Sequence, residues 1–291
     1  MRTITFLLLI IYSINGMAQT SYSGYLGKFP ITLITYHYSD GDTRAYYLYD
    51  KFDTPIIING ELNNGKLTLF ERDNKGNISA TLIFPQFKEG NSEINGKWIK
   101  KDNSKTYKIS LKKDFDLNYG DSIEWKSKEL IQSKSTKEHY FKTIISKEKG
   151  DFFGRITRVK IFEKKTDRLI QTIKLHCQLF GIDNVNVGDY NFDGVQDFSV
   201  FETSYAGPNT SSIYILRNPN SEKYFVSDFQ GTSLEFDNTS KLIYEHNQCC
   251  AGRSHMNATY KVVNNKMILI ERKCLEYNDE KEDFIEIECE E

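Results

Sequence analysis

The sequence consists largely of short runs in which apolar and polar residues alternate, and turn-forming residues separate these runs. The alternation is clearest at residues 30–36 (Pro-Ile-Thr-Leu-Ile-Thr-Tyr), 66–71 and 155–162. A period of two places every second side chain on one face of an extended strand, and hardly any window has the period of a helix. Aromatic residues, which favour strands, are abundant, with 18 Tyr and 19 Phe against 5 Pro. We therefore predict an all-β protein.

The first part of the chain has the pattern of a small, self-contained β unit. Between residues 19 and 113 we expect about eight strands at regular spacing. The turns at residues 39–42, 63–65 and 73–77 contain Asn, Asp and Gly, which supply the positive φ angles that tight turns need. This series predicts an N-terminal up-and-down β-barrel or a sandwich over residues 19–113.

A second β-rich domain is expected over residues 138–291, after a linker at 114–137 where the alternation loosens and the charge density rises. Its first hairpin has the strand period in both arms, at residues 155–162 and 169–173. Further strands are predicted at residues 199–203, 212–216, 224–228, 241–246, 257–263, 267–272 and 283–288. The two units are not copies of each other.

The N-terminus has the composition of a secretory signal peptide. One positive charge at Arg2 precedes an apolar run at residues 4–12, and small residues follow at Gly16 and Ala18. We predict a signal peptide over residues 1–18, with cleavage between Ala18 and Gln19. The apolar run is short for a membrane span and no second one follows, so we expect an exported periplasmic or extracellular protein without a stable membrane anchor. The net charge is -2 and no long basic run occurs, which disfavours nucleic acid as a partner.

All five cysteines lie in the second half of the chain. In an exported protein the default expectation is disulfide bonds. We expect Cys249 and Cys250 to pair with Cys274 and Cys289 in an order that the sequence leaves open, and Cys177 to lie inside a strand. Adjacent cysteines rarely bridge each other, because the intervening peptide is strained in such a ring.

One loop has a definite chemical character. Residues 189–197 (Asp-Tyr-Asn-Phe-Asp-Gly-Val-Gln-Asp) place an oxygen-bearing side chain at every second position, with a glycine sixth. Calcium binds six to eight oxygens, and glycine permits the sharp turn that wraps them around one ion. We predict one structural calcium ion bound by the side chains of Asp189, Asn191, Asp193 and Asp197 and by the carbonyl of Val195.

Two alternatives to the calcium site are weighed. The acidic loop can instead cap a hairpin without a metal, although crowded carboxylates repel one another. His246, Cys249, Cys250 and His255 carry nitrogen and sulfur donors that suit zinc. Against zinc stand the irregular spacing and an exported location, where cysteines are oxidised.

The acidic loop resembles the calcium-binding turns of integrin-type propeller repeats and dockerins. A longer pattern comprises residues 187–194 (Val-Gly-Asp-Tyr-Asn-Phe-Asp-Gly), Asp197-Phe198, 206–209 (Ala-Gly-Pro-Asn), Tyr214 and 249–252 (Cys-Cys-Ala-Gly). This pattern is similar to a family of bacterial periplasmic β-proteins related to periplasmic inhibitors of invertebrate-type lysozyme, some of which are effector-immunity proteins. The resemblance implies a lysozyme-inhibitor-like second domain. It also implies that a loop containing Ser204, Tyr205 and Gly207 binds a lysozyme-like peptidoglycan hydrolase.

No motif for catalysis stands out in the sequence. A nucleophile elbow, a phosphate-binding glycine loop and a dinucleotide fingerprint are all absent. We therefore expect a binding protein and not an enzyme. The alternatives are a carbohydrate- or surface-binding module, with aromatic residues 46–49 or the Tyr205 loop as its platform, and an enzyme that acts on glycans with paired carboxylates. The sequence leaves the oligomeric state open.

Overall fold

The computed structural model of this chain describes residues 18–50, 54–88, 90–117 and 120–289. The predicted signal peptide lies outside the described residues except for Ala18, which opens the first strand. The described residues form an all-β protein, as predicted, with one short 3-10 turn at Cys250–Gly252. Among these residues, no helix is long and apolar enough to cross a membrane.

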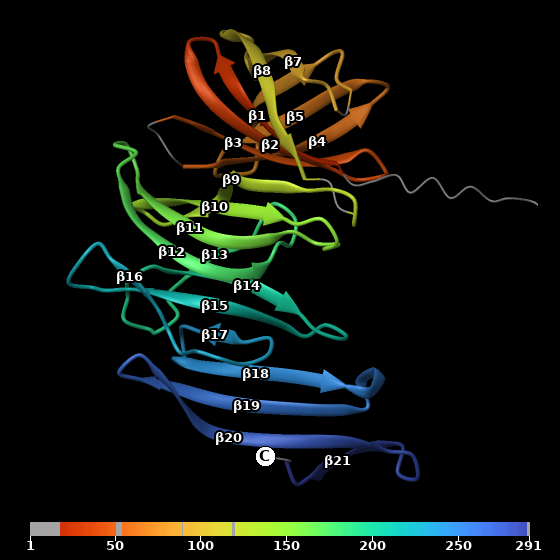
Figure 1. Cartoon of the computed structure of the whole chain (residues 1–291), viewed down its shortest axis with the longest axis vertical. Helices are drawn as coiled ribbons and strands as arrows, with labels where there is room; N and C mark the ends of the chain where they lie inside the picture. The colour runs from red at the N-terminus through yellow and green to blue at the C-terminus, as the bar shows by residue number, and fades with distance from the viewer. Residues whose placement is uncertain (1–17, 51–53, 89, 118–119, 290–291) are drawn as a thin grey trace, which may run out of the picture.

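Eight antiparallel strands form a closed barrel at one end of the molecule (Figure 1). Each strand pairs with the next one along the chain, and β1 also pairs with β8. This up-and-down closure confirms the predicted barrel rather than the sandwich. The strands are β1 (Ala18–Leu26), β2 (Phe29–His37), β3 (Asp42–Tyr49), β4 (Ile56–Asn63), β5 (Lys66–Arg72), β6 (Ile78–Phe84), β7 (Glu93–Lys100) and β8 (Thr106–Asp116).

The barrel interior is filled by side chains that alternate along the strands. Leu67 and Leu69 on β5, for example, are fully buried, as a period of two requires when one face of each strand points inward. At the seam between β1 and β8 the two backbones approach closely. A Cβ atom on Gly24 (φ +155°) would lie 2.3 Å from the carbonyl oxygen of Ser110, so only glycine fits there.

Three more antiparallel sheets follow the barrel along the long axis of the molecule (Figure 1). The first, sheet B, has the order β12-β11-β10-β9, sheet C has the order β13-β14-β15-β16, and sheet D has the order β17-β18-β19-β20-β21. Their strands are β9 (Trp125–Ser135), β10 (His139–Lys147), β11 (Arg155–Glu163), β12 (Leu169–Gln178), β13 (Val185–Gly188), β14 (Asp197–Ser204), β15 (Thr210–Arg217), β16 (Tyr224–Val226), β17 (Glu235–Asp237), β18 (Leu242–Cys249), β19 (Ser254–Val263), β20 (Lys266–Asn278) and β21 (Asp283–Ile287).

The region predicted as a linker, residues 114–137, differs from the prediction. It contains the end of β8 and all of β9, the edge strand of sheet B. Its buried residues include the polar Gln132 and Ser133. These two residues interrupt the alternation of apolar and polar residues that would indicate a strand in the sequence. Gln132 is satisfied in the interior, because its side chain donates to Thr143 Oγ1 at 3.1 Å and accepts the N–H of Asn184 at 2.9 Å.

One outer face of the barrel shares a hydrophobic core with sheet B, separate from the core inside the barrel. Ile34, Tyr46 and Leu48 belong to barrel strands, yet they pack with Leu130 and Phe141 of sheet B in a cluster that continues into sheet C. The Tyr46 hydroxyl donates to the carbonyl oxygen of Ile131 at 2.8 Å. Tyr46 and Tyr47 are 2% and 1% exposed. Residues 46–49 are therefore not the exposed aromatic platform that was considered from the sequence.

We expect buried His37 to make the stability of the barrel depend on pH. Burial lowers the pKa of His37 to about 4, whereas an exposed imidazole titrates near pH 6.5. The unfolded chain therefore takes up a proton between these values that the folded chain does not. The free energy of unfolding therefore keeps its full value above about pH 6.5. It decreases as the pH falls towards 4, by up to about 3 kcal/mol.

The His37 prediction is tested by urea unfolding at pH 7.5 and pH 4.5. The His37→Gln variant should lose less stability on acidification than the wild type does. His176→Gln, which changes an exposed histidine, serves as the control and should keep the wild-type pH dependence. Equal pH dependence in all three proteins would contradict the prediction.

Candidate functional site

The loop predicted to bind calcium connects β13 to β14 and is closed by hydrogen bonds to its own backbone. The Asp189 carboxylate accepts the N–H groups of Asp193 at 3.0 Å and of Gly194 at 2.9 Å. Asn191 Oδ1 also accepts the Asp193 N–H, at 3.3 Å. The Asp193 carboxylate accepts the N–H of Val195 at 2.8 Å. Short Asp and Asn side chains favour such turns, and the structure brings Asp189, Asn191 and Asp193 together.

Asp197 lies at the end of this loop and is fully buried. Its carboxylate accepts the N–H of Tyr190 at 2.9 Å and the N–H of Arg217 on β15 at 2.8 Å. Burial raises the pKa of Asp197 to about 6 against these two hydrogen bonds, which lower it, and the charges of Asp193 and Asp189 add to the rise. The loop thus holds three carboxylates whose negative charges oppose one another.

The loop offers calcium the right kind of donor, since carboxylate and amide oxygens surround a turn with Gly194 at φ +84°. Among the residues that the structure describes, no group of three or more His, Cys, Asp or Glu side chains is arranged to hold a metal ion. The carboxylates are instead bonded to backbone amides. In the structure, the loop is an acidic turn whose carboxylates accept hydrogen bonds from the backbone N–H groups of the same loop.

A groove of about 670 Å³ opens at one end of sheets B and C. Its walls come from elements that are far apart in the sequence. The turn between β10 and β11 is held to the end of β12 by the Leu179 N–H, which donates to the Gly154 carbonyl at 2.9 Å. The lining residues are Asp151, Phe152, Phe153, Gly154 and Arg155 on one side, and His176, Gln178, Glu202, Thr203 and Ser204 on the other.

Polar groups of the groove are organised in pairs. The Arg155 guanidinium donates to Nε2 of His176 at 2.9 Å, an arrangement that the neutral imidazole makes. The Thr203 hydroxyl donates to Gln178 Oε1 at 3.1 Å. Because each pair links two different strands, the groove presents charged and amide groups in fixed positions.

Exposed aromatic side chains lie in the groove or close to its lining residues in the sequence. Phe152 in the groove is 57% exposed, and Phe180, two residues beyond Gln178, is 62% exposed. Tyr205, next to Ser204, is 54% exposed. Single exposed aromatic side chains are common on protein surfaces, whereas a contiguous exposed apolar patch marks an interaction site.

The three residues that the resemblance assigned to partner binding lie on one turn at the edge of the groove. This β14–β15 turn, residues 204–209, is closed by the Tyr205 N–H, which donates to the Asn209 carbonyl at 2.9 Å. Ser204 lines the groove and Tyr205 projects outward. Gly207 has φ +73°, and a Cβ atom there would make only an ordinary contact of 3.9 Å with Gln248 Nε2, so glycine is required by the turn rather than by packing.

Sequence reasoning missed Asn209, which fastens the turn to sheet D. Asn209 is 7% exposed, and its amide donates to the Gln248 carbonyl at 2.7 Å and to Asn247 Oδ1 at 2.9 Å. The Gln248 N–H donates back to Asn209 Oδ1 at 3.2 Å. Asn209 belongs to the sequence pattern that carries the resemblance, but nothing in the sequence indicated its partners on β18.

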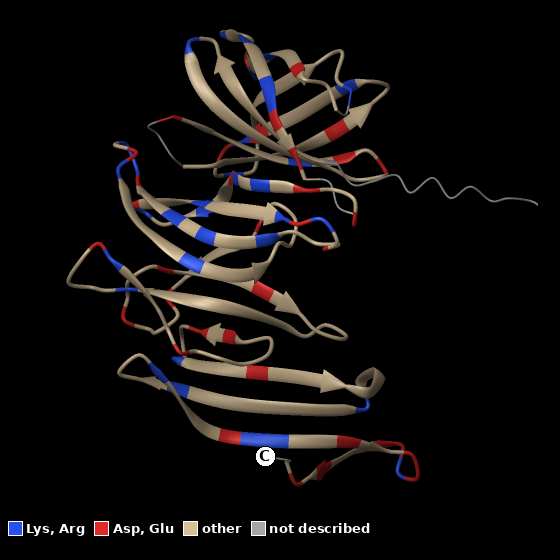
Figure 2. Ribbon diagram, in the orientation of Figure 1, with Lys and Arg blue, Asp and Glu red and all other residues tan. Residues whose placement is uncertain are grey.

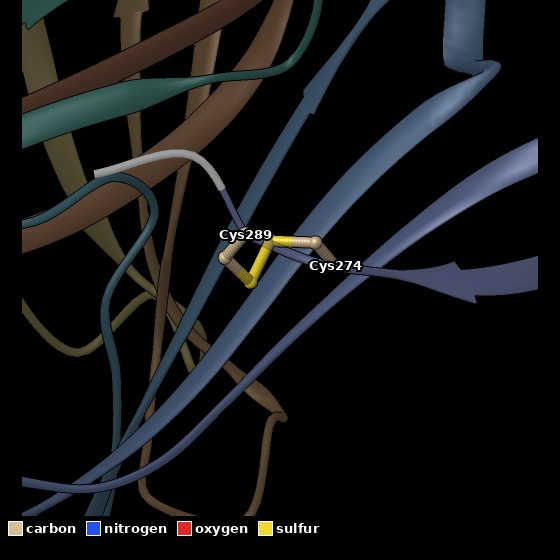
Figure 3. Close-up of a disulfide and its surroundings, with 2 residues drawn as sticks. All are labelled: Cys274 and Cys289. Carbon is tan, nitrogen blue, oxygen red and sulfur yellow. A yellow bond between two sulfur atoms is a disulfide. The ribbon is translucent and has the colours of Figure 1, made fainter.

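The disulfide prediction is wrong in its pairing. Cys274 on β20 is bonded to Cys289, which follows β21 (Figure 3). Cys249 lies at the end of β18, opposite Ser254 of β19, and it is β19 that pairs with β20. Strand β19 thus separates Cys249 from Cys274. Cys177 lies in β12 and is buried, and burial together with the Glu202 charge raises the pKa of its thiol to about 12.

The residues considered for zinc come only partly together. The rings of His246 and His255 are 5.3 Å apart between centroids. Hydrogen bonds already engage both, since His246 Nδ1 lies 2.7 Å from Asn257 Oδ1 and His255 Nε2 lies 2.9 Å from the Gly252 carbonyl. In the described part of the chain they belong to no group that could hold a metal ion.

Comparisons with known proteins found no relative of this chain. No family model matches the sequence, and no curated protein or solved structure is significantly similar to the chain.

Proposed function

We propose that this chain is a binding protein that recognises a lysozyme-like peptidoglycan hydrolase through the turn 204–209 and the groove beside it. The observation that carries the proposal is the groove itself, which contains fixed polar pairs and the exposed rings of Phe152 and Phe153. Exposed Tyr205 directly follows the lining residue Ser204 in the chain. Aromatic and arginine side chains dominate the energetics of protein interfaces. The class of partner rests on the resemblance of residues 187–194, 206–209 and 249–252 to the lysozyme-inhibitor family.

The turn is well suited to enter a partner's cleft. It is closed by its own backbone and held by three hydrogen bonds between Asn209 and residues 247–248. A segment that is already ordered loses less conformational entropy on binding, and this favours affinity. Lys and Arg predominate along the strands of sheet B (Figure 2), and in the groove Arg155 lies with the acidic residues Asp151 and Glu202. Charged groups of both signs are thus available to a partner there.

Binding without catalysis is the role that the groove chemistry supports. Its polar groups engage one another, as in the Arg155–His176 and Thr203–Gln178 pairs. The thiol of Cys177, next to both His176 and Gln178, stays protonated at neutral pH because burial raises its pKa to about 12. A protonated, buried thiol is a poor nucleophile.

The binding proposal is tested by isothermal titration against two classes of partner in parallel, lysozyme-type hydrolases and soluble peptidoglycan fragments. We expect saturable binding to at least one hydrolase and none to the fragments alone. Binding to the fragments without binding to any hydrolase would contradict the proposal.

A carbohydrate-binding module is the second candidate, and a specific observation favours it. Exposed aromatic rings beside paired polar side chains are the features by which proteins hold sugars, and the groove contains Phe152 and Phe153 together with Arg155 and Gln178. The titration against peptidoglycan fragments separates this candidate from the first.

An exported location fits the cysteine chemistry. The Cys274–Cys289 disulfide forms and persists in oxidising compartments, which supports the signal peptide proposed for residues 1–18. N-terminal sequencing of the secreted protein should give Gln19 as the first residue, and an intact Met1 in all of it would contradict export through this segment.

We further propose that the acidic loop binds one calcium ion, which relieves the repulsion among Asp189, Asp193 and Asp197. Calcium at about 100 times its dissociation constant should then stabilise the wild type by roughly 2.7 kcal/mol. The Asp193→Ala variant should lose this response, because it lacks one ligand and one capping group. Calorimetry and thermal unfolding with calcium or a chelator measure both effects.

Asp73→Ala is the matched control for the calcium test. Asp73 also accepts backbone N–H groups, from Lys75 and Asn77, in an exposed turn of the barrel. Removing it should leave the calcium response unchanged. If Asp193→Ala and the wild type respond to calcium alike, the loop is a turn without a metal.

A further inference from the structure

Two adjacent cysteines at the tip of the β18–β19 hairpin have sulfur atoms in unusually close contact. The Sγ atoms of Cys249 and Cys250 are 2.7 Å apart, which is shorter than the optimal contact of about 3.5–4.0 Å even between carbon atoms. Both residues are exposed, and neither takes part in the Cys274–Cys289 disulfide. The distance is closer to a covalent bond of about 2.04 Å than to a contact between free thiols.

The backbone around the pair is held in an unfavourable conformation. Cys250 (φ 57°), Ala251 (φ 55°) and Gly252 (φ 82°) are consecutive left-handed residues, and only the last is a glycine. Left-handed backbone is costly for other L-residues unless the surroundings impose it. Within this turn the Arg253 N–H donates to the Cys250 carbonyl at 3.2 Å, and His255 Nε2 lies 2.9 Å from the Gly252 carbonyl. A covalent ring would impose the conformation.

We propose that Cys249 and Cys250 form a vicinal disulfide, which fixes the tip of this hairpin. The oxidant is a disulfide of the thiol-exchange class, such as oxidised glutathione or a disulfide-carrying oxidoreductase. One cysteine thiolate attacks it and releases the first thiol, and the neighbouring sulfur then displaces the second thiol from the mixed disulfide. The pair loses two electrons and two protons, and the oxidant is reduced to two thiols.

The hairpin tip is joined to the turn 204–209 through the residue before the pair. Gln248 both donates to and accepts from Asn209, at 3.2 Å and 2.7 Å. The Cys249–Cys250 ring therefore restrains the strand end that holds the turn. Reduction of the ring is expected to loosen residues 204–209. This inference stands independently of any binding partner.

The test uses the position of the tryptic cleavage sites in the full chain. Lys241 and Arg253 bound a peptide, residues 242–253, that contains both cysteines and no others. After oxidation with oxidised glutathione and treatment with iodoacetamide, this peptide should be two hydrogen atoms lighter than its dithiol form and carry no alkyl group. After reduction it should take up two alkyl groups. Two alkyl groups without reduction, or a link to the Cys274 or Cys289 peptide, would overturn the proposal.

Hydrogen–deuterium exchange tests the coupling to the turn. In the Cys249→Ser/Cys250→Ser variant, residues 204–209 should exchange at least several-fold faster than in the oxidised wild type. The control is Cys274→Ser/Cys289→Ser, which removes a disulfide of the same sheet that lies on the far side of β19. It should leave exchange at the turn unchanged. Equal protection of the turn in the wild type and in the vicinal variant would overturn the coupling.

Discussion

Phe198→Ala is expected to lower the free energy of unfolding by about 3–5 kcal/mol, as for other large aromatic side chains removed from a core. Phe198 is fully buried on β14. Its ring lies 4.4 Å from that of Phe141 on β10 and 5.2 Å from that of Tyr224 on β16, between centroids. It therefore joins sheets B and C, and the cavity left by alanine would open between them. Equilibrium unfolding in urea measures the loss.

Phe225→Ala on the same sheet is the matched control. Phe225 is 38% exposed, so the loss should stay below about 1 kcal/mol. Should Phe198→Ala fail to fold, Phe198→Leu keeps most of the volume and should cost on the order of 1 kcal/mol. A cost at Phe198 no greater than at Phe225 would contradict the shared core between the sheets.

Tyr205→Ala is expected to weaken binding to the hydrolase by about 30-fold, the effect of losing a residue worth about 2 kcal/mol at the centre of an interface. Tyr205 is 54% exposed on a turn that is already ordered. Its truncation removes contact area without disturbing the core. The free energy of unfolding should change little, which separates loss of binding from loss of fold.

The barrel provides a control for Tyr205. Tyr25 on β1 is 57% exposed, which is close to the exposure of Tyr205. Tyr25→Ala therefore removes the same kind of side chain from the barrel, which contributes no residue to the groove lining. Its dissociation constant for the hydrolase should equal that of the wild type. Similar losses in both variants would show that the turn is not the recognition surface.

The strands of the barrel were predictable where only one face of the strand is buried. Alternation such as Leu67 and Leu69 on β5 is preserved in the sequence, and glycine and asparagine mark the turns. The sequence indicates the packing of the barrel against sheet B less clearly than it indicates the strands. Residues 45–49 (Ala-Tyr-Tyr-Leu-Tyr) form a continuous apolar run, which is the pattern of a strand buried on both faces. The alternative of an exposed aromatic platform at residues 46–49 overlooks this pattern.

The candidate site was predictable only where its residues are neighbours in sequence. The acidic loop and the turn 204–209 are each continuous segments, so their composition indicated them. The groove is not a continuous segment of the chain. It is lined by Phe152, Arg155, His176 and Glu202, which come from three strands and a turn. Only the sheet order brings these residues together, and no local pattern encodes that order.

The predicted cysteine pairing was wrong for a related reason. Counting cysteines favoured bridges from Cys249 and Cys250 to Cys274 and Cys289, but strand register decides which sulfurs meet. Met256 of β19 is the residue opposite Cys274, and no cysteine of β18 can reach across it. The register follows from the hairpin between β18 and β19, whose tip the sequence did not locate.

We propose that the turn 204–209 engages the catalytic cleft of a lysozyme-like hydrolase. This proposal is tested by the rate of peptidoglycan hydrolysis by a panel of lysozyme-type enzymes, titrated with the wild-type protein and with Tyr205→Ala in the presence of calcium. We predict that the wild type inhibits at least one enzyme at a stoichiometric ratio and that Tyr205→Ala requires about 30-fold more protein for the same inhibition. Undiminished hydrolysis across the panel, or equal inhibition by the variant, would contradict the claim.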